Sequence, residues 1–211
     1  MNQHSQIVQD HHRRILDAAW RCFVRAGFHR ATMQDVAAEA GMSAGNIYRY
    51  FPSKDAIVSG ICERDRAAIA SCFASLESDA DPLGAFMAIA RLHLVEEPRE
   101  NAIFTLDLWA EAARNPHVSA ICEAFEVDIR DWIGRFVARL KARGDAHPDL
   151  NVAALVDLLV SIADGLLARR ARDPRFNPAG HLDHLESVLR LACAGAIMSL
   201  LRTASSPSEP A

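Results

Sequence analysis

Apolar residues recur every three or four positions along almost the whole chain, and short polar turns separate these stretches. This spacing places the apolar side chains on one face of a helix, so it predicts an almost entirely helical protein. Three helix starts are marked by an acid or amide before proline, at residues 81–82, 115–116 and 177–178, because proline fits the first helical position. The sequence therefore predicts an all-α fold of about nine helices, which include residues 11–26, 32–40, 44–51, 53–77, 98–114 and 150–171.

Residues 32–54 hold the most informative local pattern, two short helices joined by a glycine turn. Thr32 stands at an N-cap position, and Asp35 follows where the acid of a capping box belongs. Gly41 can adopt the left-handed conformation that ends a helix, and Pro52 cannot continue the second helix. Two short helices packed across such a turn are the outline of a helix-turn-helix, which places its second helix in the DNA major groove.

The outer face of the second helix carries side chains suited to reading DNA. Arg49 can form two hydrogen bonds with guanine, and Asn46 can do so with adenine. Hydroxyl and ammonium groups nearby suit phosphate oxygens, which fix the register of a protein on DNA. The candidate DNA-binding residues are Thr32, Ser43, Ala44, Gly45, Asn46, Tyr48, Arg49, Tyr50 and Lys54. An ordinary helical hairpin with a solvated arginine also fits this pattern.

Three groups of residues follow one another between Arg13 and Ile61, one for each predicted helix of this region. The first group is residues 14–19, 23 and 26–28. The second is residues 32, 36–37 and 40–41, and the third is residues 48, 50–51 and 53–54. In combination they resemble the DNA-binding domain of the tetracycline-repressor (TetR) family of transcriptional regulators. The resemblance implies that Tyr48 and residues 44–46 face bases or the adjoining backbone. It also implies phosphate contacts from Thr32, Ser43, Tyr50 and Lys54.

Two later segments, residues 152–167 and 182–197, are apolar on nearly every side. A helix of this kind must be covered on both sides. The simplest arrangement is a twofold dimer in which both helices of each chain form a four-helix bundle, and the family resemblance implies the same. A monomer in which both are central core helices is the alternative. The candidate interface residues are Leu155, Leu159, Ile162, Leu166, Leu185, Leu189, Ala192 and Ala196.

The middle helices carry enough aromatic residues to line an apolar cavity for a small apolar or aromatic effector. The candidates are Phe73, Phe86, His93, Phe104, Trp109, Phe125 and Trp132. Aromatic residues at helical spacing are more often part of a plain core. The resemblance implies a repressor that binds a palindromic operator as a dimer and is relieved by its ligand. A regulator controlled by a partner protein, or an activator without a small-molecule ligand, is the alternative function.

Charge is divided unequally along the chain, whose net charge is −4. Residues 1–60 hold 7 Arg and Lys against 5 Asp and Glu, and the rest holds 16 against 22. A basic N-terminal part on an acidic body is compatible with binding to a phosphate backbone. The expected domains are a disordered arm (1–10), a DNA-binding domain (11–60), a helical regulatory and dimerisation domain (61–202) and a disordered tail (203–211).

Other classes of function lack their sequence motifs. The chain has no glycine-rich phosphate loop, no His-Glu-x-x-His helix and no nucleophile elbow, so an enzyme is disfavoured and no cofactor is expected. His181 and His184 alone make an incomplete metal site. No apolar run approaches the 18 or so residues of a membrane span, and no segment resembles a signal peptide, so we expect a cytoplasmic protein. Five scattered cysteines are interpreted as reduced core residues, with a redox sensor as the alternative.

Overall fold

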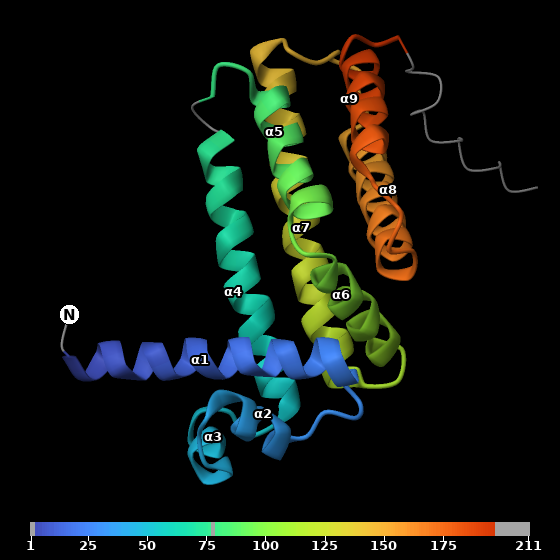
Figure 1. Cartoon of the computed structure of the whole chain (residues 1–211). Coiled ribbons are helices and arrows are strands. Elements are labelled where there is room, and N and C mark those ends of the chain that lie inside the picture. The colour runs from blue at the N-terminus through green and yellow to red at the C-terminus, as the bar shows by residue number, and fades with distance from the viewer. Residues whose placement is uncertain (1–2, 77–78, 197–211) are drawn as a thin grey trace, which may run out of the picture. The chain divides into compact units, whose positions relative to one another are not determined.

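The computed structural model describes residues 3–76 and 79–196 (Figure 1). Within these residues the chain forms nine α-helices, one π-helical segment and no strand, which confirms the all-α expectation. The helices are α1 (Gln3–Ala26), α2 (Met33–Ala40), α3 (Ala44–Tyr50), α4 (Lys54–Ser75), α5 (Pro82–Arg91), α6 (Arg99–Ala112), α7 (Pro116–Arg143), α8 (Val152–Arg172) and α9 (Ala179–Cys193). The π-helical segment, Leu92–Glu96, directly follows α5.

Side-chain caps begin several of these helices as their sequences predict. The Asp81 carboxylate accepts from the Gly84 backbone N–H at 3.1 Å, with Pro82 at the first helical position of α5. The Asn115 side-chain oxygen accepts from the His117 N–H at 3.1 Å, at the start of α7. Such caps satisfy backbone donors that have no partner within the helix.

Several predicted helix boundaries differ from those of the structure, most clearly in α1 and α9. α1 begins at Gln3, although residues 1–10 were expected to be disordered, because residues 3–10 contain no glycine or proline and a helix needs no apolar stripe to propagate. α9 begins one residue after the expected Pro178, and the Asn177 side chain accepts from the Ala179 N–H at 2.9 Å. α9 ends at Cys193, because Gly195 adopts φ +78° and stops the helix short of Ala196. The expected tail, 203–211, lies outside the described residues.

The chain divides into two compact units, which combine distant segments. Among the described residues, the first unit comprises 3–71, 97–128 and 167–176, and the second comprises 72–76, 79–96, 129–166 and 177–196. These units do not follow the expected division at residue 60. The reason lies in packing, since Phe104 of α6 stacks on Phe23 of α1 with ring centroids 6.1 Å apart.

The first unit is built around one apolar core to which α1, α2, α3 and α4 each contribute fully buried side chains. Ile15, Phe23, Ile47 and Ile61 are each at most 1% exposed. Burying a side chain of this size stabilises a fold by about 1.5–3 kcal/mol. Ile47 is the only residue of α3 in the fully buried set, so this side chain anchors the short helix.

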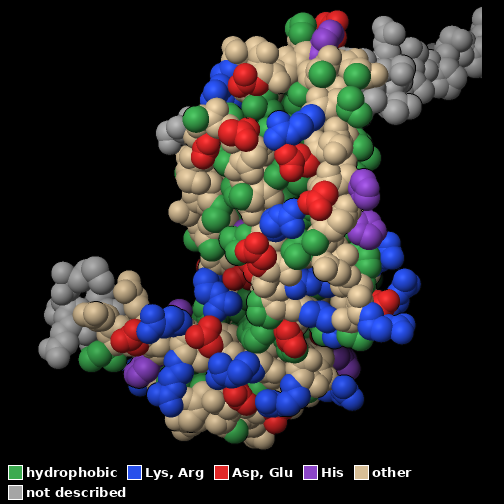
Figure 2. Space-filling view, turned by 45° about the horizontal axis from the view of Figure 1, so that its top comes forward, with side chains coloured by type: hydrophobic (Ala, Val, Ile, Leu, Met, Phe, Trp, Pro, Cys, Tyr) green, Lys and Arg blue, Asp and Glu red, His purple; other side chains and the backbone are tan. Residues whose placement is uncertain are grey.

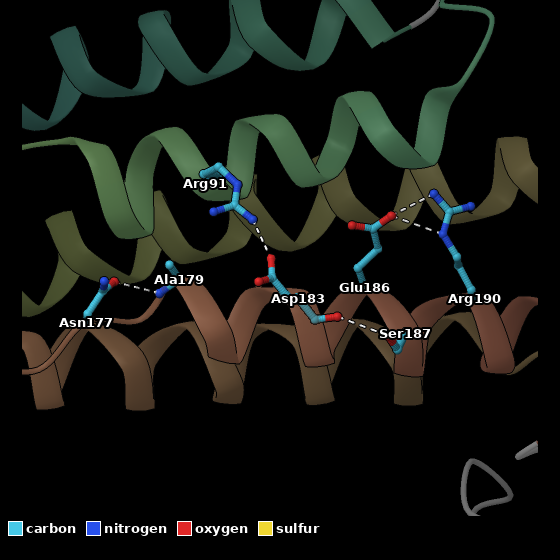
Figure 3. Close-up of polar contacts among 7 residues, drawn as sticks. All are labelled: Arg91, Asn177, Ala179, Asp183, Glu186, Ser187 and Arg190. Carbon is cyan, nitrogen blue, oxygen red and sulfur yellow. Dashed lines mark hydrogen bonds and ion pairs between the residues drawn. The ribbon is translucent and has the colours of Figure 1, made fainter.

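The second unit contains α5 and α9, which pack against each other. The Arg91 guanidinium of α5 binds the Asp183 carboxylate of α9 at 2.6 Å, and Glu186 pairs with Arg190 one turn away on α9 (Figure 3). Phe86 of α5 stacks on Phe136 of α7 with ring centroids 4.7 Å apart. Apolar packing therefore forms the inside of this unit, and ion pairs lie on its surface.

Candidate nucleic-acid interface

Two hydroxyl caps define the helix-turn-helix formed by α2 and α3. The Thr32 hydroxyl accepts from the Asp35 N–H at 3.1 Å, and the Asp35 carboxylate accepts from the Thr32 N–H at 2.8 Å, which confirms the capping box. The Ser43 hydroxyl accepts from the Asn46 N–H at 3.3 Å at the start of α3. Both helices therefore begin where the sequence places them.

The Thr32 hydroxyl also makes a second hydrogen bond, as a donor. Its proton is donated to Asp35 at 2.7 Å, and this hydrogen bond is the main reason why the pKa of the Asp35 carboxyl lies below its ordinary value. A hydroxyl has a single proton to donate, and a phosphate oxygen can only accept. The phosphate contact expected from the Thr32 side chain would therefore require this intramolecular bond to break.

The turn between α2 and α3 is held by hydrogen bonds from its own backbone and from α1. Gly41 adopts φ +60°, the left-handed conformation predicted for it, and the N–H of Met42 donates to Ala37 at 2.9 Å. The Arg14 guanidinium of α1 donates to the Gly41 carbonyl at 3.3 Å. A side chain at position 41 would bring its Cβ within 2.8 Å of that guanidinium. The turn therefore depends on glycine and on α1.

α2 is also tied to α1 through charge. Glu39 accepts from Arg21 at 2.8 Å and from Arg25 at 3.1 Å. The hydrogen bonds from Arg21 and then Arg25 lower the pKa of the Glu39 carboxyl. Because α3 follows α2 after a fixed turn, these contacts orient the outer face of α3.

The outer face of α3 is open to solvent. Tyr48 is 52% exposed, Arg49 and Ser43 are exposed, and nothing lies within 4 Å of where a Cβ on Gly45 would stand. Asn46 is half-buried. In the view of Figure 2, Lys and Arg side chains are frequent over the lower part of the protein, with acidic side chains among them. α3 thus presents a guanidinium, a phenol ring and a small residue to an incoming molecule.

Tyr50 lies between α3 and α1. Its hydroxyl is 2.8 Å from Nδ1 of His11, and its ring meets the rings of His11 and His12 edge to face. The ring of His12 also contacts Phe51, with centroids 4.7 Å apart. Sequence reasoning missed both histidines, because they contact a residue 38 or 39 positions further along the chain and nothing next to them indicates that contact.

Lys54, predicted to contact a phosphate, also makes contacts within the chain. Its ammonium donates to the carbonyls of Phe28 at 2.8 Å and His29 at 3.2 Å, and it lies 4.6 Å from the centroid of the Phe28 ring. On the opposite side of this turn, the Asp107 carboxylate of α6 accepts from the Phe28 N–H. Within the chain, Lys54 therefore binds the backbone after α1. These two contacts leave one ammonium hydrogen for a DNA phosphate, so the predicted phosphate contact stays a prediction.

Replacing Lys54 with methionine is expected to lower the free energy of unfolding by about 1–2 kcal/mol, because two carbonyls lose a charged donor. Urea denaturation of the protein without DNA measures this change. Arg13→Met is the control, since Arg13 pairs only with the exposed Asp10 at 3.0 Å in the contacts described. Unchanged stability together with weaker DNA binding would indicate that Lys54 contacts a phosphate and does not stabilise the fold.

The seven aromatic and histidine candidates for an effector site do not gather in one unit. Phe104, Trp109 and Phe125 belong to the first unit, where Phe104 is buried in the core. The second unit contains His93 and an aromatic cluster of Phe73, Phe86, Trp132 and Phe136. The seven candidates are divided in this way because the long helices α4 and α7 contribute residues to both units, and the effector site stays a prediction.

Within the aromatic cluster the rings lie against one another. The Phe73 and Trp132 rings are stacked with centroids 5.9 Å apart, and both side chains are half-buried. Phe86 and Phe136 are at most 6% exposed. A separate groove in the same unit is lined by small and apolar residues of α7 and α8 with charged groups beside them: Arg130, Asp131, Gly134, Arg135, Ala138, Val152, Ala153, Val156 and Asp157.

The residues predicted for the dimer interface lie mostly inside a single chain. Leu155, Leu159, Leu166, Leu185, Leu189 and Ala192 are each at most 8% exposed. They therefore belong to the chain's own core, which corrects the prediction for these side chains. Ile162 is half-buried, and Ala196 is exposed beyond the end of α9. The exposed large apolar side chains of the same two helices are Leu158, Val188 and Leu191.

Four of the five cysteines have thiols whose pKa is raised by burial. All five are free, and burial raises the pKa of the Cys62 thiol to about 12. Burial also raises the pKa of Cys22, Cys122 and Cys193. Thiols with raised pKa values are poor nucleophiles at neutral pH.

The part of the chain that the structure describes lacks two other kinds of site. It contains no group of three or more His, Cys, Asp or Glu side chains able to hold a metal ion. None of its helices combines the length and the apolar character needed to cross a bilayer.

Comparisons with known proteins agree with this arrangement. Residues 15–61 match the family model of bacterial regulatory proteins of the TetR family, and residues 85–194 match that of the BetI-type transcriptional repressor, C-terminal. The HTH-type transcriptional repressor Rv1474c of Mycobacterium tuberculosis is 31% identical over 198 residues, which cover 88% of this chain and 98% of the relative. The HTH-type transcriptional regulator UidR of Escherichia coli is 27% identical over 160 residues, 74% and 79% of the two chains. The solved structure of Salmonella enterica GusR superposes with a TM-score of 0.75 at 22% identity, covering 88% of this chain and 96% of that one.

Proposed function

The chain belongs to the TetR family of bacterial transcriptional regulators, and on that premise we propose that it is a dimeric repressor of a palindromic operator, relieved by a small molecule. As a member of the family it is a DNA-binding regulator and not an enzyme. The observation that carries the proposal is the open face of α3, where Tyr48 and Arg49 project from a helix anchored by the buried Ile47.

Base reading is assigned to Arg49 and Asn46. The Arg49 side chain is exposed, and a guanidinium recognises the two acceptors of guanine in the major groove. Gly45 leaves room for the backbone of α3 to approach the base edges. Ser43, Tyr48 and Tyr50 lie around these two residues and suit backbone phosphates. In this proposal residues 11–60 are the DNA-binding domain and residues 61–202 the regulatory and dimerisation domain.

Dimerisation is assigned to the exposed apolar residues of α8 and α9. Leu158, Val188 and Leu191 are 37%, 39% and 48% exposed. Covering them with a second copy removes this surface from water, which is favourable. Two recognition helices related by a twofold axis would read half-sites about 34–36 Å apart, or a multiple of that distance. The dimer therefore makes operator affinity depend on the separation of its two α3 helices.

The effector is assigned to the aromatic cluster of the second unit. Phe73 and Trp132 are half-buried, so an apolar or aromatic molecule that parts these rings would gain stacking contacts. A ligand that binds better when the recognition helices are wrongly separated lowers the population able to bind DNA. Such a ligand relieves repression without touching the operator.

Genome-wide footprinting with the purified protein tests this function. The expected result is protection of near-palindromic sites, and Arg49→Ala protein serves as the matched control that should lose them. Thermal unfolding across a panel of aromatic and apolar compounds then identifies effectors, because a ligand that binds the folded state raises Tm. The same compound should release the protein from its site. Protected sites without any responsive compound would favour control by a partner protein, and scattered protection without symmetry would contradict the proposal.

A further inference from the structure

The hydroxyl of Tyr50 is bound by a histidine within the protein. Nδ1 of His11 lies 2.8 Å from the Tyr50 oxygen, and the two rings meet edge to face with centroids 5.7 Å apart. His12 contacts the same tyrosine ring from the next position of α1. The last turn of the recognition helix is therefore held against α1 by two imidazoles.

The direction of the hydrogen bond in this pair determines whether the Tyr50 phenol proton is available to a DNA phosphate. A phenol has one proton to donate, and a phosphate oxygen can only accept. When the Nδ1 atom of a neutral imidazole accepts the phenol proton, that proton is not available to a phosphate. A protonated imidazole carries hydrogen on both nitrogens, so Nδ1 can only donate to the tyrosine oxygen. The phenol proton is then free to turn toward an acceptor outside the protein.

We propose that His11 is a positioning residue for DNA binding, whose protonation frees the Tyr50 hydroxyl for a backbone phosphate and adds a positive charge beside it. This inference rests on the proposed function, in which Tyr50 faces the DNA backbone. Both consequences of protonation favour the complex. DNA affinity therefore rises as the pH falls from 8 to 6, the range in which histidine changes its charge.

The other charged groups around this pair keep their charge over that range. On α1, Asp10 and Arg13 form an ion pair at 3.0 Å, and Arg14 donates to the Gly41 carbonyl of the turn before α3. On α3, Arg49 is the neighbour of Tyr50 in sequence. Carboxylates and guanidinium groups do not titrate between pH 6 and 8. Besides His11, the second imidazole in direct ring contact with Tyr50 is that of His12.

The experiment uses the full-length protein and a duplex enriched from random DNA by repeated selection with the wild-type protein. Its Kd is measured by fluorescence anisotropy at pH 6, 7 and 8 and at constant ionic strength, because salt alone changes affinity. The wild type is compared with His11→Gln and Tyr50→Phe. His12→Gln tests the neighbouring histidine, and His117→Gln, on the exposed surface of α7, is the matched control.

We expect wild-type affinity to be about tenfold higher at pH 6 than at pH 8, since a hydrogen bond beside a full charge is roughly twice as strong as a neutral one. His11→Gln and Tyr50→Phe should each lose most of this difference, and His12→Gln and His117→Gln should keep it. Circular dichroism at each pH confirms that the variants remain folded.

Several results would overturn the inference. A wild-type pH profile retained in His11→Gln excludes His11 as the titrating group. A loss of affinity in His11→Gln that is equal at every pH indicates packing alone. A profile retained in Tyr50→Phe excludes the release of the phenol proton. Failure of the wild-type protein to enrich any duplex would contradict the proposed function itself, and this outcome is distinct from all the others.

Discussion

Arg49→Ala protein should bind its operator about a hundredfold more weakly than the wild type, or weaker still. A guanidinium paired with guanine contributes about 1–3 kcal/mol of discrimination, and a dimer loses one such contact in each half-site. The fold should not change, because Arg49 is exposed and α3 is anchored through the buried Ile47. Titration of a labelled operator in a gel shift at constant salt measures the loss.

Arg175→Ala is the matched control for this variant. It removes the same charge from a side chain that is 92% exposed and lies outside the helix-turn-helix. General attraction to DNA should fall little in either variant, so binding to a scrambled duplex should differ much less than binding to the operator. An equal decrease on both duplexes would show that Arg49 contacts the backbone and does not read a base.

Charge placed on the exposed apolar residues of α8 and α9 should separate the dimer into folded monomers. In the double variant Leu158→Glu/Leu191→Glu, four carboxylates would be buried without partners across a twofold interface. Each unpaired buried charge costs several kcal/mol. Both positions are substantially exposed in the single chain, so the monomer itself should keep its helical content. Sedimentation at micromolar concentration measures the mass, and circular dichroism measures the helicity.

Leu159→Glu distinguishes the interface from the core. Leu159 is next to Leu158 in sequence but only 5% exposed, so its carboxylate would be forced into the interior of one chain. We expect this variant to unfold or aggregate. A double variant that remains dimeric would place the interface elsewhere on the protein. A Leu159→Glu protein that folds normally would contradict the burial described for that position.

Local chemistry made the helix-turn-helix predictable from sequence. Each of its structural elements depends on residues that are close together in the sequence. These elements are the capping box of Thr32 and Asp35, the left-handed turn at Gly41 and the N-cap at Ser43. The same holds for the caps at Asp81 and Asn115. The DNA-reading helix could therefore be located from sequence, because the residues that begin it, end it and form the turn before it are all close to it in the sequence.

Contacts between distant segments were not predictable in this way. The two carbonyls that bind Lys54 belong to the turn after α1, and nothing in the residues next to Lys54 indicates them. The apolar pattern of α8 and α9 showed that their surfaces need covering, but it could not distinguish cover within the chain from cover by a second chain. Leu159 is 5% exposed in the single chain and its neighbour Leu158 is 37% exposed. Only the packing of the folded chain separates them.

The chain contains two lysines, and the structure binds the ammonium group of each to backbone carbonyls, Lys54 to residues 28 and 29 and Lys141 to Leu150 at 2.9 Å. The positive charge on the face of α3 comes from a guanidinium, which stays protonated throughout the physiological pH range. Acetylation neutralises lysine ammonium groups and leaves guanidinium groups charged. Enzymes that acetylate lysine therefore have no target on α3, and amine-reactive labels attached elsewhere on the protein leave the positive charge of α3 unchanged.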